Sequence, residues 1–280
     1  MSSAAPAERA ALWIAQAWSE RDADDAALAV DALALGHLCR LLAPDAAGVV
    51  SELEDAVGRA VAQPAWPAAN LMMALLAAAG AVHEGNAFAA SAGEYLQILG
   101  ELHDCAARGT NDVLLRAAFY GADDCMSFDL RVAVTGVHGD VDEVRGVLDA
   151  IEASSSFGTA PLHSEEPLPL LLEGAAVAAF RAYDLPRGMR LLRARSYVRD
   201  EPSPGLAAGL EFVRSAQCDD GSFGDYDTAL AQMAAHGERN AVLRLKTPVT
   251  MQALWTIAEL ESPSFRLVDA ALAPLRLARC

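Results

Sequence analysis

Helical periodicity runs through most of this chain, in segments that alternate between two types. In the first type, apolar residues recur every three or four positions and leave one polar face; in the second, nearly every position is apolar. The first type covers 7–18, 45–62 and 89–105, and the second covers 26–42 and 67–82. An amphipathic helix keeps one face in water, whereas a helix that is apolar all round must be covered by others. The alternation therefore predicts an inner and an outer layer of helices.

Further helices are expected along the second half of the chain, where Pro, Gly, Ser and Asp stand at helix-stop positions. These segments are 141–153, 167–183, 205–217, 248–260 and 264–278, and a mixed apolar region over 112–134 is broken near Gly121. The pattern predicts an all-α fold with an (α/α)6-type toroid, a double ring of helices around a central cavity. We expect a single toroid domain over 1–280. An irregular helical bundle or solenoid is the alternative that periodicity alone leaves open.

Composition supports helices and excludes several classes of partner. Of the 280 residues, 53% are hydrophobic, and the net charge of −17 leaves no basic surface for nucleic-acid phosphates or an anionic membrane. The longest apolar run, 71–82, has about twelve residues, which is too short to span a bilayer. We expect no nucleic-acid partner and no stable membrane span.

Cysteine usage and the start of the chain indicate a cytoplasmic protein. The cysteines form an odd, scattered set without a CxxC pair, which is typical of reduced thiols in a cytosol: Cys39, Cys105, Cys125, Cys218 and Cys280. The first residues lack the basic and apolar regions of a signal peptide.

One short motif is specific enough to indicate a family. The segment 211–224 is an apolar helix end followed by Gln217-Cys-Asp-Asp-Gly221-Ser-Phe223-Gly224. It resembles the QW repeat of squalene-hopene and other class II terpene cyclases, in which an outer helix ends in Gln-x-x-x-Gly-x-Trp; here Phe223 replaces the Trp. We expect Gly221 to hold a backbone conformation that is costly for other residues, and Phe223 to pack as a plug between adjacent outer helices. Segments 246–260 and 172–180 resemble the inner helices of these proteins, and 147–158 resembles a degenerate copy of the repeat. Because the same repeats occur in protein prenyltransferase β subunits and other toroids, the resemblance is more specific for the fold than for the reaction.

The resemblance implies a chemistry that depends on a neutral carboxylic acid. Class II cyclases protonate an alkene or epoxide with an acid in an Asp-x-Asp-Asp motif at the start of an inner helix, and the third position is the donor. The complete pattern occurs at Asp22-Ala-Asp24-Asp25, before an apolar helix. Aspartates at this position are also expected simply as helix caps.

A partial match, Gly121-Ala-Asp123-Asp124, has the more apolar surroundings. Phe119 and Tyr120 precede it and Phe128 follows it, and an apolar environment raises the pKa of a carboxylic acid. We therefore prefer Asp123 as the proton donor with Asp124 as its partner, and keep Asp24, flanked by Asp22 and Asp25, as the rival. An N-capped buried helix is the structural alternative at 123–124.

The remaining expectations concern the cavity and its ligand. Aromatic faces stabilise carbocations, and the aromatic residues expected around the substrate are Trp66, Phe119, Tyr120, Phe128, Phe180 and Trp255. No metal motif or organic cofactor fingerprint is present, so Mg²⁺ is expected only if the substrate is a diphosphate. The densest basic group comprises Arg187, Arg190, Arg193 and Arg195, and we expect it on a solvated face.

These expectations combine into one functional hypothesis. By its resemblance to monodomain meroterpenoid cyclases, the chain is predicted to be a terpene cyclase of the class II type that acts on a small-molecule prenylated substrate. The alternative is a non-catalytic α/α toroid that binds an apolar ligand or a partner protein. The burial of Asp123 and Asp124 is the feature that separates the two hypotheses.

Overall fold

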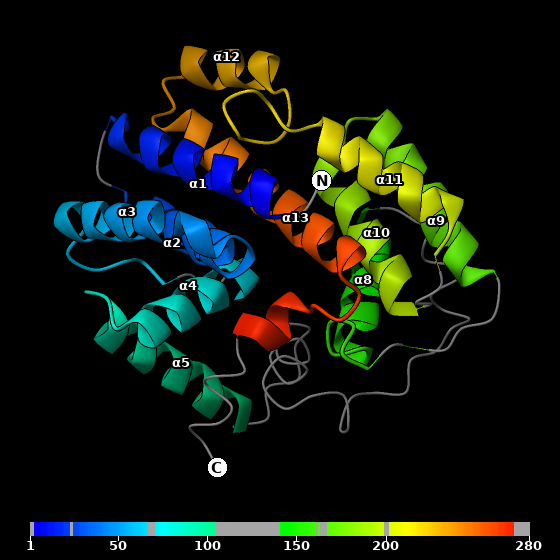
Figure 1. The fold of residues 1–280 in the computed structure, drawn as a ribbon, viewed down its shortest axis with the longest axis horizontal. Coiled ribbons are helices and arrows are strands. Elements are labelled where there is room, and N and C mark those ends of the chain that lie inside the picture. Colours follow the sequence, from blue (N-terminus) through cyan, green and yellow to red (C-terminus); the bar gives the residue numbers. More distant parts are fainter. Residues whose placement is uncertain are drawn as a thin grey trace. The chain divides into compact units, whose positions relative to one another are not determined.

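The computed structural model describes residues 3–22, 25–66, 71–104, 141–160, 162, 167–198 and 202–271. In these ranges the regular secondary structure is helical, and strand-like pairing is confined to one isolated antiparallel bridge between Gln217 and Phe223. Figure 1 shows the helices as a ribbon. The all-α prediction is confirmed, whereas the double ring of a toroid and the single domain over 1–280 stay predictions. None of the helices in the described ranges has the length and apolar character needed to cross a membrane.

The helices have the following bounds, with labels as in Figure 1: α1 (Ala4–Ser19), α2 (Ala26–Leu42), the 3-10 helix η1 (Pro44–Ala46), α3 (Ala47–Ala60), α4 (Leu71–Glu84), α5 (Ala89–Asp104), α8 (Val141–Ser154), α9 (Leu168–Arg181), α10 (Leu185–Val198), α11 (Pro204–Ser215), α12 (Asp227–Ala235) and α13 (Ala241–Glu261). Residues 267–271 are also helical, as the expected segment 264–278 requires, and the rest of that segment lies outside the described residues.

Three elements differ from the sequence-based expectation. Helices α10 and α12 were not expected: arginines interrupt the apolar pattern of α10, and α12 buries none of its residues. Helix α13 begins at Ala241 rather than at Pro248, so that Pro248 lies inside the helix. A proline there lacks the N–H that would bond to the carbonyl of Arg244, and the packing of a long buried helix outweighs that loss.

The chain divides into two compact units, each built from two stretches of sequence. The first unit comprises Met1–Ile98 and Ser215–Trp255. Within it, α1, α2 and α3 pack on one another and α4 packs on α2. Helix α2 is buried on nearly every side between Leu28 and Cys39, whereas α3 buries only one face. The predicted alternation of amphipathic and fully covered helices is therefore present in this unit.

The second unit comprises Leu99–Arg214 and Thr256–Cys280. Helix α10 packs against both α8 and α9. Helix α8 ends in a left-handed turn in which Ser156, Phe157 and Gly158 have φ angles of 45°, 54° and 82°. The N–H of Phe157 donates to the carbonyl of Glu152, which closes the last turn of α8. The segment 147–158, which resembles a degenerate copy of the repeat, ends in this turn.

Candidate functional site

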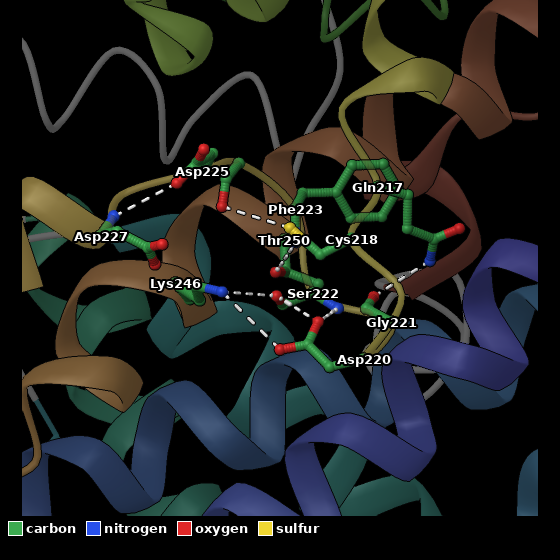
Figure 2. Close-up of polar contacts among 11 residues, drawn as sticks. Gln217, Cys218, Asp220, Gly221, Ser222, Phe223, Asp225, Asp227, Lys246 and Thr250 are labelled. Carbon is green, nitrogen blue, oxygen red and sulfur yellow. Dashed lines mark hydrogen bonds and ion pairs between the residues drawn. The ribbon is translucent and has the colours of Figure 1, made fainter.

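The turn that suggested the family is held by its own glutamine. Figure 2 shows this turn, in which Gln217 Nε2 donates to the carbonyl of Gly221 at 3.0 Å. The same amide donates to the carbonyl of Pro6 in α1, also at 3.0 Å. The N–H of Phe223 donates to Thr250 Oγ1 of α13 at 3.1 Å. The turn is therefore held against α1 and α13 within the first unit.

Glycine and phenylalanine occupy the two special positions of this turn as the motif predicts. Gly221 has a φ of +98°, and a Cβ atom there would lie 2.3 Å from the carbonyl oxygen of Arg9. Both facts exclude a side chain. Phe223 is 1% exposed. The predicted glycine conformation and the burial of the aromatic ring are confirmed, and the packing of Phe223 between outer helices stays a prediction.

A polar cluster at the turn consists of Asp220, which is exposed, and of Ser222 and Lys246, which are buried (Figure 2). Ser222 Oγ donates to Asp220 Oδ1 at 2.6 Å and accepts from Lys246 Nζ at 3.0 Å. Partial burial acts to raise the pKa of Asp220, but hydrogen bonds from the hydroxyl and N–H of Ser222, with the nearby Lys246 ammonium, hold that pKa below its ordinary value. Because Ser222 is fully buried and its proton is directed at Asp220, the cluster stabilises the turn and does not present a nucleophile.

Of the aspartates that precede α2, Asp22 and Asp25 lie among the described residues, and Asp25 has a structural role. Asp25 is the N-cap of α2, and its Oδ1 accepts from the N–H groups of Ala27 at 3.0 Å and Leu28 at 3.3 Å. Its other oxygen pairs with Arg244 of α13. Asp22 is exposed, and its N–H donates to the side chain of Asn240 at 3.0 Å. Asp25 is therefore engaged as the cap of α2 and in an ion pair with α13.

A further carboxyl on the same helix was not identified from the sequence. Asp31 lies in the second turn of α2 between the buried residues Val30 and Ala32. No donor among the described residues forms a hydrogen bond with its carboxyl. Burial first, and then the negative charge of Asp25, raise the pKa of Asp31 to about 6, although Arg244 acts in the opposite direction. Its isolated position, without an acidic neighbour in sequence, gave no motif to detect.

An aromatic pair lies close to the start of α2. The N–H of Ala65 donates to the carbonyl of Ala26 at 3.1 Å, which places the segment before Trp66 against the first turn of the helix. Trp66 stacks on Tyr95 of α5, with 5.3 Å between ring centroids and 17° between ring planes. Trp66 was expected to line the cavity, and that role stays a prediction. Tyr95 was not expected there.

The other aromatic candidates in the described residues pack in helix cores. Trp255 is 2% exposed within α13. Phe180 of α9 lies 4.8 Å from the ring of Phe212, and a Cβ on Gly188 would meet the Phe180 ring at 2.4 Å. Both residues therefore stabilise the helix packing of their own units.

The preferred proton donor and its surroundings cannot be placed. The following predicted site residues lie outside the described residues: Asp24, Phe119, Tyr120, Asp123, Asp124 and Phe128. Their roles stay predictions.

The prediction that the arginines of α10 lie on a solvated face is wrong. Arg193 and Arg195 of α10 are 1% and 4% exposed. Arg190 pairs with both Asp149 and Glu152 of α8, and Arg195 Nε bonds to Glu173 of α9 at 2.8 Å. These partners lie on other helices and far away in sequence, so the local charge pattern of α10 could not reveal them.

The second unit also contains a buried tyrosine–carboxylate contact. Tyr197 donates from its hydroxyl to Glu259 Oε2, while Glu259 Oε1 accepts from the N–H of Leu267 at 2.9 Å. Burial first, and then the charge of Glu259, raise the pKa of Tyr197 well above its ordinary value. Arg193 donates at 2.7 Å to Oγ1 of Thr256, which lies close to Glu259 in the sequence of α13. These groups serve as polar core contacts of the second unit.

Comparisons with known proteins leave the family unassigned. Among the described residues, no three His, Cys, Asp or Glu side chains gather as a metal site would require. No protein-family model, curated protein or solved structure matches this chain. The resemblance to class II cyclases therefore rests on the motif residues alone.

Proposed function

We propose that this chain is a class II-type terpene cyclase that protonates an alkene or epoxide of a linear prenyl chain with a buried aspartic acid. The observation that carries the proposal is Asp31, a half-buried carboxyl whose pKa is raised to about 6 on a helix that is buried on nearly every side between Leu28 and Cys39. The repeat turn at 217–224 and the all-helical architecture support the same family. A meroterpenoid, in which the prenyl chain carries an aromatic head group, is the substrate class that the resemblance favours.

The chemistry requires an acid that keeps its proton until the substrate is bound. An ordinary aspartic acid with a pKa near 4 is almost fully ionised at neutral pH, whereas a pKa of about 6 leaves roughly a tenth of the molecules protonated at pH 7. An apolar substrate would displace water from the carboxyl and raise that fraction further. The stacked faces of Trp66 and Tyr95 would then offer a cation–π surface for the carbocation, worth on the order of 0.5–2 kcal/mol.

In this mechanism no metal or organic cofactor takes part. The proton passes from the Asp31 carboxyl to the terminal alkene carbon or epoxide oxygen, and the resulting cation is captured by the next alkene of the chain. Loss of a proton from the cyclised cation to a base completes an isomerisation, so atoms and charge balance. Mg²⁺ would enter only as the counterion of a diphosphate substrate.

A non-catalytic toroid that binds an apolar ligand or a partner protein is the second candidate, and one observation favours it. Asp25, the last acid of the complete motif, caps α2 and pairs with Arg244, so it is not available as an acid. Asp123 and Asp24 remain the alternative proton donors. Cytoplasmic localisation remains a prediction.

The test is turnover of prenylated substrates by matched variants. The protein is incubated with a prenylated hydroquinone and with its terminal epoxide, and products are separated by liquid chromatography with mass detection for cyclised isomers. Asp31→Asn is expected to abolish cyclisation while Asp22→Asn, which changes an exposed carboxyl at the same end of α2, retains it. Loss of turnover in Asp123→Asn or Asp24→Asn, with Asp31→Asn active, would move the acid to that position. Binding of these substrates without any cyclised product in the wild type would support the non-catalytic alternative.

A further inference from the structure

A histidine is buried in the contact between α2 and α4. His37 lies in the middle of α2 and is 3% exposed. Its ring rests on Gly80 of α4, where a Cβ atom would lie only 2.6 Å from the ring Cγ. The two helices can approach this closely because residue 80 has no side chain. The ring Nδ1 is buried, and no hydrogen-bond partner for it lies among the described residues.

The charged groups around the His37 ring disfavour its protonation. Arg40 of α2 and His83 of α4 act on it, and the acids nearby are already engaged: Arg40 bonds to Glu54 of α3 at 2.8 Å and lies 3.5 Å from Glu84 of α4. Burial first, then Arg40 and then His83, lower the pKa of His37 to about 4. The folded protein therefore keeps this imidazole neutral where a solvated histidine would be protonated.

We infer that the contact between His37 and Gly80 is an acid-sensitive joint, at which protonation of the imidazole separates α4 from α2. A charged ring needs water or an acceptor at Nδ1, and the glycine contact leaves room for neither. Opening this contact would also change the surroundings of Asp31, which lies on α2 less than two turns before His37. The inference does not rest on the proposed cyclase activity, because it depends only on the contact between His37 and Gly80.

The sign of the effect follows from proton linkage. In the unfolded chain His37 takes up a proton below pH 6.5, whereas in the folded protein it does so only near pH 4. The contribution of neutral His37 to the free energy of unfolding is therefore fully present above pH 6.5, and it is lost as the pH falls from 6.5 to 4. The expected size is a rise of about two orders of magnitude in the unfolding equilibrium constant over that range.

The test compares the full-length wild type with His37→Gln and with the control His83→Gln, a change at the exposed histidine of α4. Urea unfolding is followed by circular dichroism at pH 7, 5.5 and 4. The unfolding constant of the wild type is expected to rise by about two orders of magnitude more than that of His37→Gln between pH 7 and 4, with His83→Gln following the wild type. Parallel changes in the wild type and His37→Gln would overturn the inference.

Two further measurements locate the effect and do not depend on how well His37→Gln folds. Hydrogen exchange of the wild type, corrected for the intrinsic pH dependence, should show faster exchange in α2 and α4 at pH 4 than at pH 7. A nuclear magnetic resonance titration of the wild-type His37 ring should have its midpoint near pH 4. A midpoint at pH 6 or above, or unchanged exchange in both helices, would also overturn the inference.

Discussion

Replacing Asp31 with asparagine should make the protein more stable at neutral pH. The carboxyl has a pKa of about 6 in the folded protein and about 4 in the unfolded chain. Near pH 7 this difference of roughly two units lowers the free energy of unfolding, because the folded state disfavours the ionised form. At 1.36 kcal/mol per unit, the ionised Asp31 costs about 3 kcal/mol of unfolding free energy. Asparagine has nearly the same shape as the neutral acid and cannot ionise. We therefore expect Asp31→Asn to gain about 2–3 kcal/mol at pH 7.

The pH dependence makes this prediction specific. Because the folded-state pKa is raised, the folded protein binds more protons than the unfolded chain between pH 6 and 4, and the penalty disappears as the pH falls through that range. Urea unfolding at pH 7 and pH 4 should therefore show a large gain for Asp31→Asn at pH 7 and almost none at pH 4. Asp22→Asn, at an exposed position, should stay within about 0.5 kcal/mol of the wild type at both pH values. A loss of stability in Asp31→Asn at pH 7, or a gain that does not change with pH, would refute the reasoning.

The remaining predictions concern packing. Phe223→Ala should lower the free energy of unfolding by about 3–5 kcal/mol, because the ring is fully buried, and an unchanged thermal melt would show that the ring does not anchor the turn. Gly221→Ala should cost several kcal/mol, since its Cβ would overlap the Arg9 carbonyl in a left-handed conformation; normal urea stability would contradict the turn geometry. Tyr197→Phe should cost about 1–3 kcal/mol by removing a buried donor to Glu259, measured by urea unfolding, and a neutral result would mean that water replaces the hydroxyl.

Local patterns were sufficient to predict much of the fold. The 26–42 segment is apolar nearly all round, and it forms α2 with the same bounds. The glycine and aromatic positions of the 217–224 motif could be predicted because a left-handed φ and a buried plug are properties of the turn itself. Short-range periodicity and turn chemistry decide such features, and both are visible in a single sequence.

Contacts between distant segments could not be predicted in the same way. Arg190 and Arg195 look like surface residues in the sequence, but Asp149, Glu152 and Glu173 neutralise them from other helices. Asp31 carries no motif, and its raised pKa comes from burial and from Asp25, both of which depend on the fold. A pattern search favours clustered acids, although clusters at helix starts are the positions where capping keeps carboxylates ionised.

The stability and activity of Asp31→Asn together decide whether Asp31 is the proton donor. A carboxyl with a purely structural role should stabilise the fold through hydrogen bonds or an ion pair, as Asp25 does through the α2 cap and Arg244. Asp31 has no such described partner, and it opposes folding at neutral pH. A proton donor must have this property, because the interactions that would stabilise its charge would also remove its proton. If the substitution raises stability and abolishes cyclisation, the cost of the buried acid is a requirement of the chemistry. If it raises stability and leaves ligand binding and turnover unchanged, the buried carboxyl plays no part in function and the acid must lie elsewhere in the chain.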